Sequence, residues 1–370
     1  MFQTPHAVLP KPTHDEFARE EFCASLRKLF TTSLWPGCRE VYEKRQLPLF
    51  RQRHGRDPSS ANEVFDLMRE SFYYRGANLL GRTAQEMVWD TVGESVERQL
   101  DDLNRKARPA RPGKGSLRLN PDLVMPRYMQ AVDIHVMPGN FHGDRSSDDV
   151  YAGALYDRGV YVFAFGGLGA LNDNYGHAIA NFIKARFPKF KPRRILEIGC
   201  GTGMATLPVA QAFPKAEMHA VDVGAALLRY AHARAESLNV AVNFSQQDAC
   251  HLDFPDNHFD LVYSIIVTHE CPVPVLRSML AEIHRVTAPE GIMMHDGYFK
   301  PAPLKPIDEV MNTWFALNAN EPFSRGFRRF DFERGFADAG FAPERHFTGT
   351  QAAVYLKGQL PDISFVGAIK

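Results

Sequence analysis

A glycine-rich turn between a predicted strand and a predicted helix constrains this chain more than any other feature. The segment ILEIGCGTGMA (195–205) begins with apolar, strand-forming residues and places glycines at Gly199, Gly201 and Gly203. Glycine is needed where the backbone turns tightly or where a ligand approaches the main chain. The following helix would point its free N–H groups and its positive dipole end at that ligand. Met204 stands where the GxGxxG dinucleotide fingerprint has its last glycine, so the pattern departs from that fingerprint.

From about Pro192 onward, short apolar runs alternate with helical apolar patterns. Strand patterns cover 193–199, 218–223, 242–248, 259–267 and 291–298, and helical patterns cover 204–213, 225–238 and 273–286. This alternation predicts a doubly wound α/β fold, with a mostly parallel sheet covered on both faces. Ligands of such sheets bind at the carboxyl ends of the strands, which is where the glycine turn lies.

Acidic residues follow the next two strand patterns at positions suited to a nucleoside ligand. Asp222 ends the second strand, where its carboxylate could accept hydrogen bonds from both hydroxyls of a ribose. Asp248 and Ala249 follow the third strand, where a side chain and a backbone N–H could read an adenine edge. Each feature also has a purely structural interpretation, because glycines can simply close a turn and Asp222 can cap the next helix.

In combination, the ILEIGCGTG motif, Asp222 and Asp248 resemble the class I, Rossmann-like methyltransferases that use S-adenosyl-L-methionine. The resemblance runs from about Arg194 to the C-terminus. It implies a seven-stranded sheet with an antiparallel strand near the end, for which AAVYLKG (352–358) is the candidate. The implied cofactor contacts are Glu197, Gly199, Gly201 and Gly203 around the methionine part, Asp222 and Val223 at the ribose, Asp248 and Ala249 at the adenine, and Ser264 beside the sulfonium. Ser264 could instead be a small buried residue.

The remainder of the chain divides into helical and connecting regions. We expect an N-terminal helical region over 1–112, a connecting region over 113–190 that covers the active site, and a cofactor-binding domain over 191–370 with a helical cap at about 300–330. Two capping-box patterns, Ser60 with Glu63 and Thr83 with Glu86, predict helix starts in the first region. Met311, Trp314 and Phe315 would share one face of the cap.

Candidate bases should lie at the carboxyl ends of the fourth and fifth strands. Methyl transfer from a sulfonium requires alignment of the acceptor and removal of its proton. His269 and Glu270 follow the fourth strand, and His295 ends the fifth. Histidine titrates near neutral pH and could take a proton from a hydroxyl or an amine. These groups could equally be strand-end polar residues bonded to backbone or facing solvent.

The segment DIHVMPGNFHGD (133–144) combines two histidines with two aspartates. Such a set could hold a divalent metal, but a Pro-Gly turn separates the groups and the spacing matches no established metal motif, so we assign no metal. We expect a substrate-contacting loop that carries His135 and His142 over the cofactor. Tyr175 could reach the sulfonium through its ring face.

Composition narrows the partners. Lys plus Arg and Asp plus Glu number 43 each, so net charge does not favour a nucleic acid, and the basic stretch 105–114 is interpreted as a solvated loop. The longest apolar run, 159–171, is shorter than the ~20 residues of a membrane span, and the first residues lack a signal-peptide pattern. Five cysteines without close pairing favour a reduced, cytoplasmic protein.

These patterns lead to a soluble enzyme that methylates a small molecule at oxygen or nitrogen, as in specialised metabolism. Two alternatives stay open: methyl transfer to RNA or protein, and a non-catalytic cofactor-binding module that serves interactions. A homodimer formed through the N-terminal helices also stays open.

Overall fold

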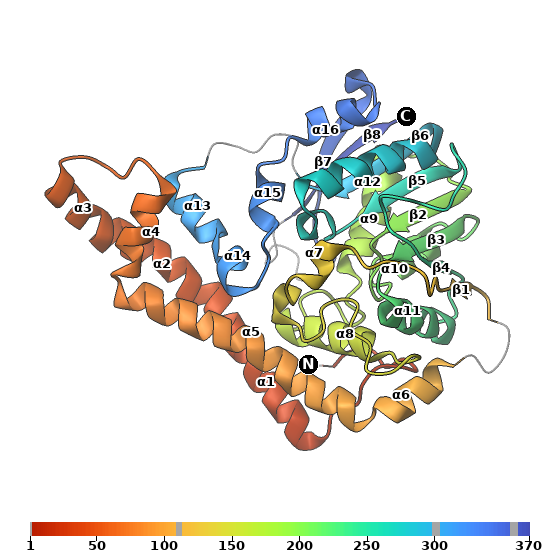
Figure 1. Cartoon of the computed structure of the whole chain (residues 1–370), viewed down its shortest axis with the longest axis horizontal. Coiled ribbons are helices and arrows are strands. Elements are labelled where there is room, and N and C mark those ends of the chain that lie inside the picture. The colour runs from red at the N-terminus through yellow and green to blue at the C-terminus, as the bar shows by residue number, and fades with distance from the viewer. Residues whose placement is uncertain (1, 109–112, 298–303, 356–361) are drawn as a thin grey trace.

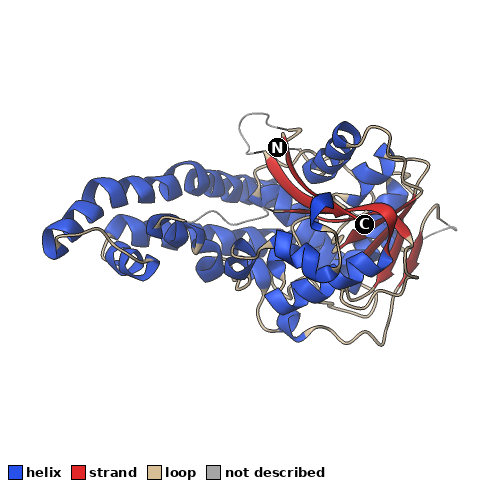
Figure 2. Ribbon diagram, turned by 90° about the horizontal axis from the view of Figure 1, so that it is seen from above, coloured by secondary structure: helices blue, strands red, loops and turns tan. Residues whose placement is uncertain are grey.

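The computed structural model describes residues 2–108, 113–297, 304–355 and 362–370. Figure 1 shows two parts, a body built on a sheet and an elongated arm of helices from the N-terminal third. The view from above shows the arm projecting away from the strands (Figure 2). Within the described ranges, no helix is both long enough and apolar enough to cross a membrane.

The body contains an eight-stranded sheet in the order β1-β4-β3-β2-β5-β6-β8-β7. The strands are β1 (Ser116–Arg118), β2 (Arg194–Ile198), β3 (Glu217–Asp222), β4 (Asn243–Gln246), β5 (Phe259–Ser264), β6 (Thr287–Asp296), β7 (His346–Gln351) and β8 (Ile363–Ile369). The first six pair in parallel, whereas β8 runs antiparallel to both β6 and β7. The predicted doubly wound, mostly parallel fold is therefore confirmed.

Two details of the predicted sheet are wrong. The described sheet has eight strands rather than seven, because Ser116–Arg118 add a short parallel edge strand beside β4. Three residues are too few to produce a recognisable alternation. Residues 352–355 are not a strand, because the Asn174 side chain accepts hydrogen bonds from the N–H groups of Val354 and Tyr355 and holds them at the start of α9. The rest of that predicted strand, 356–358, lies outside the described residues.

Helices cover both faces of the sheet. Helices α9 (Asn174–Arg186), α10 (Thr206–Ala212) and α11 (Ala225–Ser237) pack on one face, and α12 (Val273–Val286) and α16 (Phe332–Ala339) pack on the other. The sequence explains this placement, since the buried residues of α12 recur at helical spacing: Leu276, Met279, Leu280 and Ile283.

The N-terminal helices form the arm, and the sequence contains capping patterns that predict the starts of some of them. They are α1 (His14–Leu29), α2 (Trp35–Val41), α3 (Leu47–His54), α4 (Ala61–Arg69), α5 (Phe72–Arg98) and α6 (Leu100–Ala107), with π-helical turns at Phe30–Leu34 and Tyr42–Gln46. The start at Ser60 is confirmed, because its side chain accepts a hydrogen bond from the N–H of Glu63. The predicted start at Thr83 is wrong. Helix α5 begins after Ser71 and runs through Thr83, because buried residues continue on both sides of that position.

The part of the arm nearest the sheet shares a hydrophobic core with the body through α8 (Tyr151–Phe163). Two glycines of α8 allow close approach. A Cβ added at Gly159 would lie 2.2 Å from the ring of Trp89 in α5, and one added at Gly153 would lie 2.2 Å from Cβ of Tyr230 in α11. Helix α8 therefore joins the N-terminal helices to the cofactor side of the sheet by direct packing.

The cap insertion is helical where it is described, as α13 (Pro306–Asn312), α14 (Trp314–Asn318) and α15 (Ser324–Arg328). Its apolar face packs against the arm. The ring of Trp314 lies 4.8 Å from that of Phe30 and 5.9 Å from that of Trp35, measured between centroids. The start of the predicted cap, 300–303, lies outside the described residues. Short elements complete the fold: α7 (Arg127–Gln130) and 3-10 turns at Ile134–Val136, Thr268–Glu270 and Pro343–Arg345.

Candidate functional site

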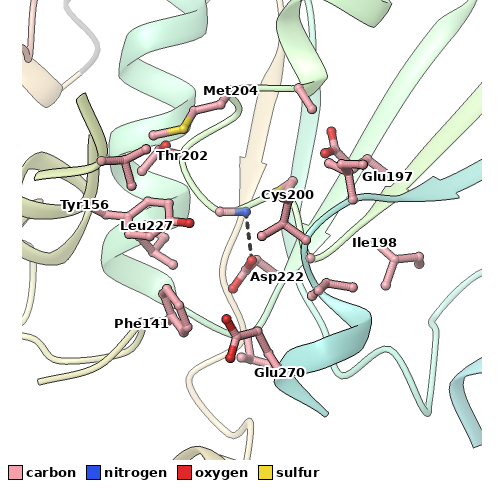
Figure 3. A pocket seen from close by; sticks show the side chains of 18 of the residues that line it. Phe141, Tyr156, Glu197, Ile198, Cys200, Thr202, Met204, Asp222, Leu227 and Glu270 are labelled. Carbon is pink, nitrogen blue, oxygen red and sulfur yellow. Dashed lines mark hydrogen bonds between the residues drawn. The ribbon is translucent and has the colours of Figure 1, made fainter. Parts of the chain in front are cut away.

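A cavity of about 380 Å³ lies at the carboxyl ends of β2, β3 and β5. One side of it is built by the glycine turn and by residues that follow the strands (Figure 3). The other side comes from the arm and the connecting region, which contribute Gln85, Trp89, Tyr128, Met129, His135, Phe141, Tyr156, Phe163 and Tyr175. Residues far apart in the sequence therefore enclose one space, with a size typical of small-molecule sites.

The glycine turn has the backbone conformation that its sequence predicts. Gly199, Gly201 and Gly203 all have positive φ, at 67°, 52° and 75°. A Cβ added at Gly199 would lie 2.2 Å from Cγ2 of Val267, so no larger residue fits there. A Cβ added at Gly201 would meet nothing within 4 Å, which leaves the main chain open to a ligand in the cavity.

Asp222 lies directly against this turn. Its Oδ2 accepts a hydrogen bond from the N–H of Gly201 at 2.8 Å, drawn in Figure 3, and its Oδ1 accepts one from Gly224 at 2.9 Å. Gly224 is the N-cap of α11 and no described side chain caps that helix, so the interpretation of Asp222 as a helix cap is wrong; its bond to Gly224 closes the turn between β3 and α11. Burial raises the pKa of Asp222, while the backbone N–H groups of Gly224 and Gly201 oppose that rise. Each oxygen keeps a lone pair that could accept a hydroxyl hydrogen.

Glu197 lies beneath the turn, where Thr206 Oγ1 and Tyr263 Oη both donate to its Oε2. Burial raises the pKa of Glu197 to about 8, which favours the neutral carboxyl at physiological pH. Glu197 thus joins β2 to β5 and to the start of α10, and it also lines the cavity. Its contacts indicate that it supports the turn as well as facing the ligand space.

The remaining predicted cofactor residues divide into two groups. Val223, Asp248 and Ala249 line the cavity beyond the ends of β3 and β4. Ser264 does not, because its hydroxyl is hydrogen-bonded to Nδ1 of His295 at 2.6 Å and both side chains are buried away from the cavity. The alternative interpretation of Ser264 as a small buried residue describes its environment better.

A nucleoside sulfonium cofactor fits the described residues. Gly201 leaves space above the turn, and the buried hydroxyl of Thr202 has no hydrogen-bond partner within the described chain. The amide of Asn172 is fixed by two donations to Asp157, which leaves its buried Oδ1 unpaired at the cavity wall. These free acceptor groups suit the ammonium and hydroxyl hydrogens of such a ligand.

The candidate bases are separated by the structure. Glu270 lines the cavity and appears beside Asp222 and Phe141 in Figure 3. His269 does not line it, but its Nε2 lies 3.3 Å from Oε1 of Glu270. His295 is buried beside Phe332 and Phe336, and burial lowers its pKa to about 3. The strand end of β6 points this histidine into the layer beneath α16, so it has no access to a ligand in the cavity.

The half-buried side chain of His135 forms a junction between three parts of the chain. Its Nε2 lies 2.8 Å from Oε1 of Glu270, and its Nδ1 lies 3.1 Å from Oε1 of Glu321. Burial alone would lower the pKa of His135, but Glu270 and Glu321 together raise it to about 10. For Glu270, burial is outweighed by His135 and His269, which lower its pKa to about 2. At neutral pH the junction therefore contains an imidazolium between two carboxylates.

The backbone of His135 is held by the long helix of the arm. Gln85 Nε2 and Trp89 Nε1 both donate to the carbonyl oxygen of His135, at 2.8 and 2.7 Å. His135 has a φ of 57°, which is uncommon for a residue other than glycine. Sequence reasoning missed Gln85, Trp89 and Glu321, because nothing in their local pattern distinguishes them from ordinary helix or loop residues.

The other predicted substrate residues lie at different depths. Tyr175 lines the cavity, and burial raises its pKa to about 12. His142 lies outside the lining, with its Nε2 bonded to the carbonyl of Met129 at 3.0 Å. Asp144 pairs with Arg229 at 2.7 Å, so the two histidines and two aspartates of 133–144 do not converge. Within the described residues, no group of three or more His, Cys, Asp or Glu side chains could hold a metal ion.

Residues 195–291 match the family model described as "Methyltransferase domain". A malonyl-[acyl-carrier protein] O-methyltransferase of Halorhodospira halophila is 34% identical over 150 residues, which are 40% of this chain and 48% of that protein. A demethylmenaquinone methyltransferase of Thermus thermophilus is 35% identical over 100 residues, which are 27% of this chain and 44% of that protein. The chain thus spans slightly under half the length of these curated relatives.

Among solved structures, phosphoethanolamine N-methyltransferase 2 of Haemonchus contortus in complex with S-adenosyl-L-methionine is similar at a TM-score of 0.38. It is 17% identical, and the likeness covers 51% of each chain.

The stretch that matches the family model coincides with the cofactor side of the cavity. It begins in β2, includes the glycine turn, Asp222 and Asp248, and ends inside β6. The family and cofactor that the sequence motifs predicted are thereby confirmed. The chain contains a class I, S-adenosylmethionine-dependent methyltransferase domain.

Proposed function

We propose that this chain transfers a methyl group from S-adenosylmethionine to an oxygen or nitrogen of a mostly apolar small molecule. The observation that carries the proposal is the shared cavity, in which the glycine turn and Asp222 face the same space as a wall of aromatic side chains. Trp89, Phe141 and Tyr156 come from the arm and the connecting region, so they supply an acceptor wall that the sheet lacks. An enclosed apolar wall excludes water and keeps reacting groups aligned.

Glu270 is the candidate base that the geometry supports. It is the member of the predicted set His269, Glu270 and His295 that lines the cavity. The bound cofactor supplies an electrophilic methyl group. The Glu270 carboxylate would stabilise positive charge that develops on the acceptor atom, or accept the hydrogen bond of its hydroxyl or amine. His135 and His269 hold that carboxylate in place from two sides.

A macromolecular acceptor receives less support. The described residues that line the cavity include no lysine or arginine, and nucleic-acid binding relies on such contacts with phosphates. The aromatic wall also encloses the space where an acceptor would reach the cofactor. A small apolar acceptor fits that enclosure better than a base of RNA or a protein side chain.

Calorimetric titration tests the cofactor part of the proposal. S-adenosylmethionine and S-adenosylhomocysteine should bind the full chain, and NAD should not. Asp222→Ala should weaken binding of S-adenosylhomocysteine by about 2–4 kcal/mol, since it removes charge-assisted hydrogen bonds.

Asp260→Ala is the matched control for the Asp222 variant. Oδ2 of Asp260 accepts hydrogen bonds from the N–H groups of Arg193 and Arg194. These groups lie at the amino ends of β2 and β5, whereas the cavity lies at the carboxyl ends. The control loses two backbone hydrogen bonds, as the Asp222 variant does, without touching the cavity. Equal affinities of the two variants for S-adenosylhomocysteine would contradict the assigned role of Asp222. Preferred binding of NAD would contradict the proposed function itself.

A further inference from the structure

One side of the cavity is formed by the arm and the connecting region, and the methyl acceptor would bind there. Side-chain oxygens on this side can accept hydrogen bonds but have no partner among the described residues. Gln85 is 1% exposed and lines the cavity, and its Oε1 makes no hydrogen bond with any described residue. Oε2 of the buried Glu270 is unpaired in the same sense. Leaving a buried polar atom without a partner is unfavourable, so an occupant that donates hydrogen bonds to these atoms is favoured.

The orientation of the Gln85 amide is determined by its neighbour. Nε2 must face His135, because it donates to the carbonyl oxygen of that residue at 2.8 Å and an amide oxygen could not. Oε1 is therefore the amide atom that does not face the carbonyl oxygen of His135. Trp89 donates to the same carbonyl, so two side chains of α5 fix this geometry.

Positive charge on this side of the cavity is already neutralised. Among the described lining residues there is no lysine or arginine, and His135 is the cation present. Both of its ring nitrogens are paired, one with Glu270 and one with Glu321. An acceptor molecule with a carboxylate or a phosphate would find no free cation here and would face the charge of Glu270.

The neutral hydrogen-bond donors in the lining do not supply a positive charge that could pair with an anionic methyl acceptor. The hydroxyls of Tyr156 and Tyr175 can donate a hydrogen bond, but burial raises the pKa of both and keeps them uncharged. A buried anion needs a paired cation or several strong donors, whereas a neutral hydroxyl or amine needs only acceptors.

We propose that the methyl acceptor is an uncharged or cationic ring-sized molecule that donates a hydrogen bond to Oε1 of Gln85, and that Gln85 selects such donors. This inference rests on the proposed function and deepens it, because it defines the chemical class of the acceptor. A site built to bond a hydroxyl or an amine rejects analogues that lack the hydrogen, since its own polar atom is then left unpaired.

Binding of simple aromatic probes to the full chain saturated with S-adenosylhomocysteine tests this inference without any turnover. The probes are 2-naphthol, 2-naphthylamine, 2-methoxynaphthalene and 2-naphthoate, measured by calorimetry at pH 7. The naphthol and the naphthylamine should bind at least about tenfold more tightly than the methoxy compound, which lacks the donor, and than the anionic naphthoate.

Two variants distinguish two roles of Gln85: recognition of the probe through Oε1, and the hydrogen bond from Nε2 to the carbonyl of His135. Gln85→Leu should bring the affinities for 2-naphthol and 2-methoxynaphthalene to within about twofold of each other. Trp89→Phe removes the other donor to the His135 carbonyl but keeps Oε1 of Gln85, so it should retain the preference for 2-naphthol.

Three results would overturn the inference while leaving the proposed function in place. They are equal or tighter binding of 2-naphthoate, an unchanged preference in Gln85→Leu, and no binding of any probe to the chain that holds S-adenosylhomocysteine. Failure of S-adenosylhomocysteine itself to bind would instead overturn the proposed function, and the inference with it. The first titration of each experiment measures that binding, so the two failures are distinguishable.

Discussion

Replacement of the His135 cation should destabilise the fold in a manner that depends on pH. We choose His135→Asn, because asparagine tolerates the left-handed backbone at this position, where φ is 57°. The change leaves Glu270 and Glu321 facing each other without the imidazolium that now lies within 3.1 Å of both. Both carboxylates are less than a tenth exposed, so bulk water screens their charges poorly.

The expected loss of stability in His135→Asn follows from the raised pKa of His135. The pKa of His135 rises from an ordinary 6.5 to about 10, and each pH unit corresponds to about 1.4 kcal/mol, which sets an upper value of about 5 kcal/mol. Breaking a buried ion pair by removing one partner typically costs about 3–5 kcal/mol. We therefore expect His135→Asn to lower the free energy of unfolding by about 3–5 kcal/mol at pH 6.

The pH dependence has a definite sign. A histidine whose pKa is raised on folding contributes its full stabilisation below the unfolded pKa of 6.5 and loses it as pH rises toward about 10. Glu270, with its pKa lowered to about 2, contributes fully above its ordinary value of 4.5 and loses that contribution as pH falls toward about 2. The difference between wild type and variant should thus be largest between about pH 4.5 and 6.5 and should shrink by pH 9.5.

Urea denaturation at pH 6.0 and pH 9.5 measures this difference directly. His142→Asn is the control, because this histidine of the same segment bonds the carbonyl of Met129, and the loss of that one hydrogen bond should cost about 1 kcal/mol. A loss for His135→Asn that is below about 1 kcal/mol, or that is equal at the two pH values, would refute the assigned ionic junction.

Two further predictions concern the turn and the buried network behind it. Gly199→Ala should lower the melting temperature and abolish S-adenosylhomocysteine binding in calorimetry, since its Cβ would lie 2.2 Å from Val267 in a left-handed conformation, whereas Gly76→Ala on α5 should leave binding intact. Asp157→Asn should lower the free energy of unfolding by about 3–5 kcal/mol in urea, because it leaves the buried guanidinium of Arg234 without a counter-charge 3.9 Å away; a change below 1 kcal/mol would contradict that role.

The cofactor side of the site could be predicted from the sequence because its chemistry is local. The strand, turn and helix around Gly199 are contiguous, and parallel strands bring Asp222 and Asp248 to the same edge of the sheet. Periodicity of apolar residues determines each of these elements separately. The alternation therefore predicted the fold class and the end of the strands where a ligand binds, and the resemblance of the glycine turn, Asp222 and Asp248 to class I methyltransferases implied the cofactor.

Errors arose where local patterns were ambiguous. Thr83 and Glu86 form a capping-box pattern, yet tertiary packing on both sides of them continues α5 as one helix. The β-type run at 352–355 is held off the sheet by the side chain of Asn174. The sequence places His295 and Ser264 at the reacting centre because they end strands, but alternation along a strand does not reveal which face meets the cavity and which meets a covering helix.

The acceptor side was decided by tertiary structure. Gln85, His135, Glu270 and Glu321 come from the arm, the connecting region, the turn after β5 and the cap, and they meet where these four segments pack together. Sequence spacing carries no information about such contacts, since the energies that favour them arise from burial and charge pairing between distant segments. The sequence by itself thus determined which cofactor the domain holds, and the packing of distant helices decided what else can lie beside it.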